Sequence, residues 1–127
     1  MSIKNQKYKK NLNDQLLGTE DPKIIIYELL NGLNNKLGDT LLCIEKGKND
    51  DAKKNALKAQ NIAFALRKAL DHKDGGDVAK NLDYLYAHIH VATDKFIKND
   101  SDKLLNSALL VSSEIFSGWK GLVNKIA

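Results

Sequence analysis

The residues best suited to chemistry in this chain of 127 residues are three histidines and one cysteine. Metal sites inside helical bundles use histidines four residues apart, or a histidine three residues after a glutamate. His72, His88 and His90 show neither spacing. His88 and His90 are two residues apart, which directs them away from each other on a helix. We therefore expect solvent-facing histidines, no metal site and no cofactor.

Other catalytic patterns are also incomplete. Cys43 lies in an apolar run of a helical pattern, where a packed core thiol is the better interpretation than a nucleophile. The glycines of the 75–77 stretch are not followed by the Gly-Lys-Ser/Thr of a phosphate-binding loop. Lys73 takes a position where a calcium loop needs an oxygen ligand. The sequence predicts that the protein is not an enzyme.

Composition narrows the class further. Hydrophobic residues make up 43% and charged residues 28%, with few aromatics and one proline, which favours a single helical domain. The net charge of +4 comes from nineteen lysines and one arginine among sixteen acids, whereas nucleic-acid readers favour arginine. One cysteine, no secretory leader and no apolar run of eighteen residues predict a cytoplasmic protein without membrane insertion.

The sequence predicts four helices, because apolar side chains recur every three to four positions between polar breaks. These helices would position the histidines and the cysteine. The fold class we predict is all-α: an antiparallel four-helix bundle with a short N-terminal segment or helix packed over a groove. It would form one domain, 1–127. The leading segment covers 1–18, and the helices are expected at 21–46, 51–71, 77–98 and 101–123.

The expected helix starts follow from capping preferences. Asp21 is predicted as the N-cap of the first helix with Pro22 at its first position, where the missing N–H costs nothing. Asp50 or Asp51 would cap the second helix. For the last helix the candidates are Ser101 and Asp100, whereas no specific cap is predicted for the third.

The last helix has more apolar surface than one core contact requires. Residues 104–119 contain one charged side chain, Glu114. Their apolar side chains span an arc of about 160°, against roughly 100° for a helix facing a core. The surplus edge on this helical wheel consists of Leu105, Leu109 and Phe116.

Two other helices show smaller apolar groups away from their core seams. Leu57 and Phe64 lie seven residues apart, nearly opposite the predicted seam of helix 51–71. In helix 77–98 the corresponding outward group is Tyr84, Ala87 and Val91. A central helix and the leading segment could bury all of these groups. Alternatively they form grooves for the amphipathic helices of another protein, which the leading segment covers until displaced.

Several short strings, in order and at matching intervals, carry a resemblance to a known family. They begin with Tyr8-Lys9-Lys10-Asn11, followed by Asp21-Pro22 and by Leu29-Leu30-Asn31-Gly32. Further on come Lys58-Ala59-Gln60-Asn61-Ile62, then Gly75-Gly76-Asp77-Val78-Ala79-Lys80-Asn81-Leu82 with Leu85-Tyr86, and finally Asn99-Asp100 and Trp119. Over almost the whole chain, this set resembles the flagellin-specific export chaperones of the FliS family.

The resemblance implies a function and a set of partners. It implies a helical bundle that binds the C-terminal region of flagellin in the cytoplasm, prevents premature polymerisation and delivers flagellin to the flagellar type III export apparatus. Export-gate components or a co-chaperone are further expected partners, nucleic acid is not, and the protein would be a monomer or weak homodimer. The alternative is a helical-bundle adaptor or regulator that binds another protein or self-associates.

The predicted partner-binding residues combine the helical wheels with this resemblance. Apolar contacts to the cargo are expected from Leu57, Phe64, Leu105, Leu109 and Phe116. Without cargo, the same surface would be occupied or bordered by Ile3, Tyr8 and Leu12.

Overall fold

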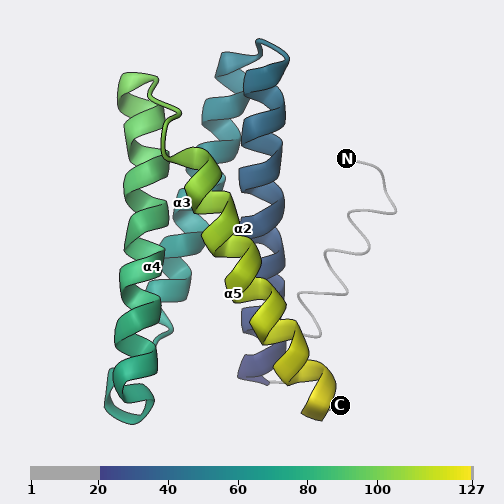
Figure 1. The fold of residues 1–127 in the computed structure, drawn as a ribbon, viewed down its shortest axis with the longest axis vertical. Coiled ribbons are helices and arrows are strands. Elements are labelled where there is room, and N and C mark those ends of the chain that lie inside the picture. The colour runs from purple at the N-terminus through teal and green to yellow at the C-terminus, as the bar shows by residue number, and fades with distance from the viewer. Residues whose placement is uncertain (1–20, 127) are drawn as a thin grey trace.

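The computed structural model of the chain describes the backbone of residues 21–126 and the side chains of residues 21–121. It confirms the all-α prediction, since the described part consists of helices and connecting turns without a strand. The four helices are α2 (Pro22–Glu45), α3 (Asn49–Lys68), α4 (His72–Asn99) and α5 (Leu105–Ile126). Consecutive helices run in opposite directions, and α5 crosses the bundle obliquely (Figure 1). Helix α2 packs against α3 and α5, and α4 packs against the same two helices, so the four form a closed ring.

The start of α2 follows the predicted capping. The Asp21 carboxylate accepts the backbone N–H of Lys23 at 2.9 Å, and Pro22 occupies the first turn. This satisfies one of the N–H groups that have no partner within the helix.

Helix α3 starts differently from the prediction. Lys48 is at the N-cap without a side-chain hydrogen bond, and Asp50 and Asp51 lie inside the first turn. The prediction of an aspartate cap was therefore wrong. The two carboxylates still favour this end of the helix, because the helix dipole presents partial positive charge there.

Helix α4 begins five residues earlier than expected. The Asp71 carboxylate caps it by accepting the N–H groups of Lys73 and Asp74 at 3.1 and 3.0 Å. Gly76 then interrupts the helical backbone with φ 52° and ψ −129°. A Cβ on Gly75 would lie 2.8 Å from the Cβ of Ala79. The two glycines thus serve different purposes, a kink and a close approach within the chain.

Helix α5 begins at Leu105 rather than at residue 101. Asp100, one of the two expected caps, instead ends α4 in the left-handed conformation with φ 59°. Its N–H donates to the carbonyl of Phe96 at 3.0 Å, and the N–H of Ser101 donates to the carbonyl of Lys95 at 3.3 Å. The αL residue therefore closes the helix that precedes it.

The core combines a seam of alanines on α3 with larger side chains from the other helices. Ala52, Ala56, Ala59 and Ala63 are fully buried. Their small side chains allow close helix packing. Opposite them lie Leu30, Leu33 and Leu37 of α2 and Ile89 and Phe96 of α4.

The described helices include none with the length and apolar character needed to cross a lipid bilayer.

Candidate partner-binding surfaces

An apolar strip lies on the outside of α3 and α4. It consists of Leu57 and Phe64 on α3 and Tyr84 and Val91 on α4, with exposed fractions of 48%, 56%, 76% and 43%. We refer to these four residues as the outer strip. The Nζ of Lys68 lies 5.4 Å from the centre of the Phe64 ring and covers part of it. The described residues also include exposed large apolar side chains elsewhere (Leu42, Val78 and Leu110), and the outer strip differs from these in bringing together two residues from each of two adjacent helices.

Polar contacts between α3 and α4 fix the level of Phe64 on α3 relative to Val91 on α4. Arg67 Nε donates to Asp83 Oδ1 at 2.8 Å, and Gln60 Nε2 donates to Asp94 Oδ1 at 3.3 Å. Phe64 lies between Gln60 and Arg67 along α3. Val91 lies between the two aspartates along α4, so both are at the same level of the bundle.

These contacts also affect the carboxylates. The hydrogen bond from Arg67 holds the pKa of Asp83 below its ordinary value, with only partial opposition from desolvation. The pKa of Asp94 is lowered chiefly by its hydrogen bond from Lys98. Both aspartates are therefore charged at neutral pH and available for their cross-helix contacts.

The predicted surplus edge of α5 is largely part of the core. Leu105 is 1% exposed and Phe116 9%, while Leu109 is half-buried against the core. The Phe116 ring meets the Tyr27 ring edge to face at a centroid distance of 5.2 Å. The wide apolar arc has a structural reason, because α5 packs against both α2 and α4. Among the α5 side chains up to residue 121, which the structure describes, the large apolar one that is exposed is Leu110, at 60%.

The predicted residues therefore separate into three groups. Leu57 and Phe64 are exposed on the outer strip. Leu105, Leu109 and Phe116 line or enter the core, so we do not retain them in the proposed surface. Ile3, Tyr8 and Leu12 lie outside the described residues.

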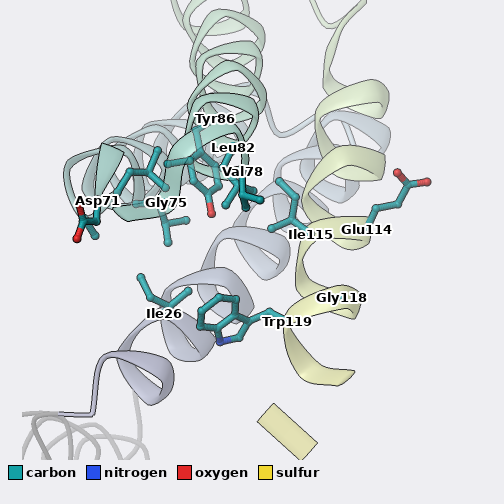
Figure 2. Close-up of a pocket in the computed structure, with 14 residues that line it drawn as sticks. Ile26, Asp71, Gly75, Val78, Leu82, Tyr86, Glu114, Ile115, Gly118 and Trp119 are labelled. Carbon is teal, nitrogen blue, oxygen red and sulfur yellow. The ribbon is translucent and has the colours of Figure 1, made fainter. Parts of the chain in front are cut away.

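A cavity of about 440 Å³ lies at the end of the bundle where α5 diverges from α4. It is between the first turns of α2 and α4, the last turn of α3 and the second half of α5 (Figure 2). The large apolar and aromatic side chains that line it are Ile26, Leu66, Leu70, Val78, Leu82, Tyr86, Ile115 and Trp119. Pockets of roughly 300–1,000 Å³ with such linings are typical ligand sites.

Tyr86 is the polar group inside this cavity. Its side chain is 2% exposed, and Figure 2 shows the hydroxyl pointing into the open space. The hydroxyl forms no hydrogen bond with another described residue. Burial raises the pKa of Tyr86 from 10.0 to about 12. Among the described residues, no side-chain nitrogen or oxygen that is sealed from solvent lacks a hydrogen-bond partner, so the Tyr86 hydroxyl is reached from the open cavity.

Trp119 and two acids define the mouth of the cavity. The indole Nε1 of Trp119 donates to the backbone carbonyl of Lys23 at 3.0 Å, which fixes the second half of α5 against the start of α2. Asp71 and Glu114 also line the opening. Sequence reasoning missed this cavity. The available signal was a tyrosine, Tyr86, at a core-spaced position of the third helix.

The residues first considered for chemistry have ordinary surroundings. His88 Nε2 lies 3.0 Å from Ser107 Oγ, and Cys43 is half-buried with Asn55 Nδ2 at 3.7 Å from its sulfur. Within residues 21–121, no group of three or more His, Cys, Asp or Glu side chains is placed to hold a metal ion. The described part of the chain is thus a helical bundle with exposed apolar side chains on two adjacent helices, an arrangement found among proteins that bind amphipathic segments.

Comparison with known proteins identifies the family. Residues 4–126 match the family described as flagellar protein FliS. The chain is 33% identical over 115 residues to the flagellar secretion chaperone FliS of Vibrio cholerae, covering 90% of this chain and 84% of that protein. It is also 35% identical over 65 residues to the flagellar secretion chaperone FliSB of Pseudomonas aeruginosa, covering 51% and 52% respectively. This chain belongs to the FliS family, a family of flagellar secretion chaperones and not of enzymes.

Proposed function

We propose that this protein binds the C-terminal region of flagellin in the cytoplasm, prevents its premature polymerisation and delivers it to the flagellar type III export apparatus. The observation that carries the proposal is the outer strip. A member of a secretion-chaperone family leaves Leu57, Phe64, Tyr84 and Val91 exposed along two adjacent helices.

The physical reason lies in the cargo. A segment that assembles through apolar faces must keep those faces covered before export, and an apolar surface on a stable bundle can cover them. Ordering such a segment costs about 2–5 kcal/mol of the gross interaction energy. That cost keeps the complex reversible, so the cargo can be released at the export gate. Export-gate components or a co-chaperone are proposed to bind elsewhere on the bundle.

Phe64→Asp tests the surface directly. The full-length chain is co-expressed with a C-terminal fragment of flagellin from the same genome, and the complex is measured by size exclusion and by titration. We expect Phe64→Asp to weaken binding by at least about tenfold, because a buried aromatic contact is a typical binding hot spot. Its free energy of unfolding should change by less than about 0.5 kcal/mol, since the side chain is exposed.

Leu110→Asp is the matched control. Leu110 is 60% exposed, close to the 56% of Phe64, but lies on α5. The same apolar-to-acid change should therefore leave binding within about twofold of wild type. Equal losses in both variants, or none in either, would remove the outer strip from the binding site.

Self-association through the same strip is the competing function, and it predicts a different result. A stable homodimer would cover the outer strip and leave it unavailable to cargo. Sedimentation of the wild-type chain at micromolar concentration distinguishes the two, because a monomer is expected here. A dimer that Phe64→Asp dissociates would favour the alternative.

A further inference from the structure

We propose that the outer strip, together with the lysines around it on α3 and α4, docks the protein onto an anionic lipid surface. The outer strip is also the proposed contact for flagellin, so lipid is a second partner for the same side chains. Docking on lipid is a property of the chain without cargo. It therefore goes beyond the proposed function and does not depend on it.

Charge is distributed unevenly over the bundle. Residues 52–70 of α3 and the turn after it contain four lysines and one arginine and no acid, and residues 78–99 of α4 contain three lysines and two aspartates. In the other half of the ring, residues 22–45 of α2 contain two lysines and three acids, and residues 105–121 of α5 contain one of each. The excess positive charge of these four segments is therefore on α3 and α4.

Four of these lysines are exposed on the same helix faces as the outer strip. Each lies three or four residues from an outer-strip residue, the spacing that places two side chains on one face of a helix. They are Lys54, Lys68, Lys80 and Lys95.

The two aspartates of residues 78–99 do not neutralise these four lysines. Asp83 pairs with Arg67 at 2.8 Å, and Asp94 pairs with Lys98 at 3.1 Å. The four lysines thus leave a positive surface on both sides of the outer strip, which complements an anionic partner.

The type of basic residue favours lipid over an acidic protein. Arginine pairs with a carboxylate through two parallel hydrogen bonds, and lysine is depleted at protein interfaces. The one arginine of the chain, Arg67, already pairs with Asp83, so the accessible cations of this surface are lysines. Lysines close to a membrane are attracted by anionic headgroups without a defined pairing geometry.

The apolar residues between the lysines suit the same partner. Helices that bind at a membrane surface combine lysines with leucine and aromatic side chains that enter the boundary between headgroups and acyl chains, and tyrosine is enriched at that depth. Leu57, Phe64 and Tyr84 are exposed by 48%, 56% and 76%. Lys54 and Lys68 are separated by about 21 Å along α3. Contacts spread over this length match a planar partner.

Lys68→Glu and Lys120→Glu form a matched pair that tests the charge. Each lysine is exposed, follows a phenylalanine by four residues and places its Nζ near that ring, at 5.4 Å from the centre of Phe64 and 4.8 Å from that of Phe116. Both substitutions change the net charge by two units, but Lys120 lies on α5.

Binding is measured by flotation of the full-length chain, without cargo, with vesicles that contain phosphatidylglycerol. At low salt we expect Lys68→Glu to weaken binding by about tenfold or more, because each basic residue near an anionic surface contributes about fivefold. Lys120→Glu should stay within about twofold of wild type. A loss that followed net charge alone would be equal in the two variants.

Leu57→Ser and Leu110→Ser test the apolar contribution with one substitution at two sites. The leucines are 48% and 60% exposed, on α3 and α5 respectively, so both variants should melt close to wild type. We expect Leu57→Ser to weaken vesicle binding by about threefold or more, since it removes a side chain that enters the lipid. Leu110→Ser should stay within about twofold of wild type.

Trp119 reports where the lipid binds, because it is the only tryptophan in the chain and lies on α5, which packs on α2 and α4 but not on α3. Its emission should stay unchanged when vesicles bind to the outer strip. A shift to shorter wavelength would place the lipid at the cavity end and overturn the assignment to α3 and α4.

The remaining outcomes separate lipid from other partners. Vesicles of phosphatidylcholine alone, or high salt, should reduce wild-type binding by about tenfold or more. Absence of this preference, or equal losses within either matched pair, overturns the proposal. Tighter binding to polyglutamate than to vesicles, lost in Lys68→Glu, assigns the surface to an acidic polypeptide and overturns the lipid assignment. Flagellin is absent from all these measurements, so their failure leaves the proposed function intact.

Discussion

The two ends of the bundle differ in how completely their interior is filled. At one end, the first half of α3 places fully buried alanines against the second half of α4, where Phe96 is 2% exposed. At the other end, near Leu66 of α3, α5 diverges from α4. A cavity of about 440 Å³ remains between them. The difference in packing follows the course of α5, which crosses the bundle obliquely and moves away from α4 at this end. One end is closely packed, whereas the other leaves apolar walls and the Tyr86 hydroxyl around an open space.

The largest expected effect on stability comes from removing a large side chain from the closely packed end. Phe96→Ala should lower the free energy of unfolding by about 3–5 kcal/mol, because well-packed surroundings cannot collapse around the missing ring. Ile115→Ala at the open end should cost less than about 2 kcal/mol, since its half-buried side chain already borders empty space. Urea denaturation followed by circular dichroism measures both. Equal losses would contradict the contrast.

Alkaline pH should affect the open end through Tyr86. The pKa of this hydroxyl is raised in the folded state to about 12 from 10.0, so the folded state holds its proton longer than the unfolded state. The related stability is fully present below about pH 10 and is lost as pH rises towards 12. The loss should be on the order of 2–3 kcal/mol in wild type and absent from Tyr86→Phe. Denaturation at several pH values compares the two proteins, and parallel curves would be inconsistent with a buried hydroxyl.

Replacing a small side chain by a larger one should also affect the stability of the two ends differently. Ala59→Leu places a larger side chain in a seam without space and should destabilise by about 1–3 kcal/mol. Ala69→Leu places the same side chain at the cavity edge, where the residue is exposed, and should change stability by less than about 0.5 kcal/mol. Thermal melts suffice for this comparison. If Ala69→Leu is as damaging as Ala59→Leu, the cavity is less open than described.

The smallest effect expected concerns Asp83, whose contact with Arg67 links α3 to α4 near the cavity. Its pKa is lowered from the ordinary value of 3.8, mainly by the Arg67 hydrogen bond. The resulting stability is present above that value and is lost as pH falls below about 4. Asp83→Asn should therefore show a shallower loss of stability at acid pH than wild type. Asp102→Asn removes the same charge from an exposed loop residue and should follow the wild-type curve.

Local signals in the sequence predicted the parts of the fold that depend on local chemistry. The Asp21 cap and Pro22 at the start of α2 were predicted because capping involves neighbouring residues. The periodic spacing also placed Leu57 and Phe64 opposite the alanine seam of α3, and both are exposed. Their role as partner contacts remains a prediction.

Features that depend on neighbouring helices could not be predicted in this way. A wheel of α5 alone shows a wide apolar arc, but not that α2 and α4 together bury most of it, including Leu105 and Phe116. The cavity is a property of four helices and of the angle of α5. The left-handed turn at Asp100 was read as the start of α5, because aspartate also favours N-caps.

The ring of helices has a consequence for biosynthesis. Helix α5 completes the ring by packing on α2, and Trp119 donates to the carbonyl of Lys23, 96 positions earlier. While the chain is being translated, the face of α2 that receives α5 has no partner until the last described helix has left the ribosome. Because contacts so distant in sequence form slowly, nascent chains should be prone to aggregation at this stage. The described fold is therefore complete only after α5 has been translated.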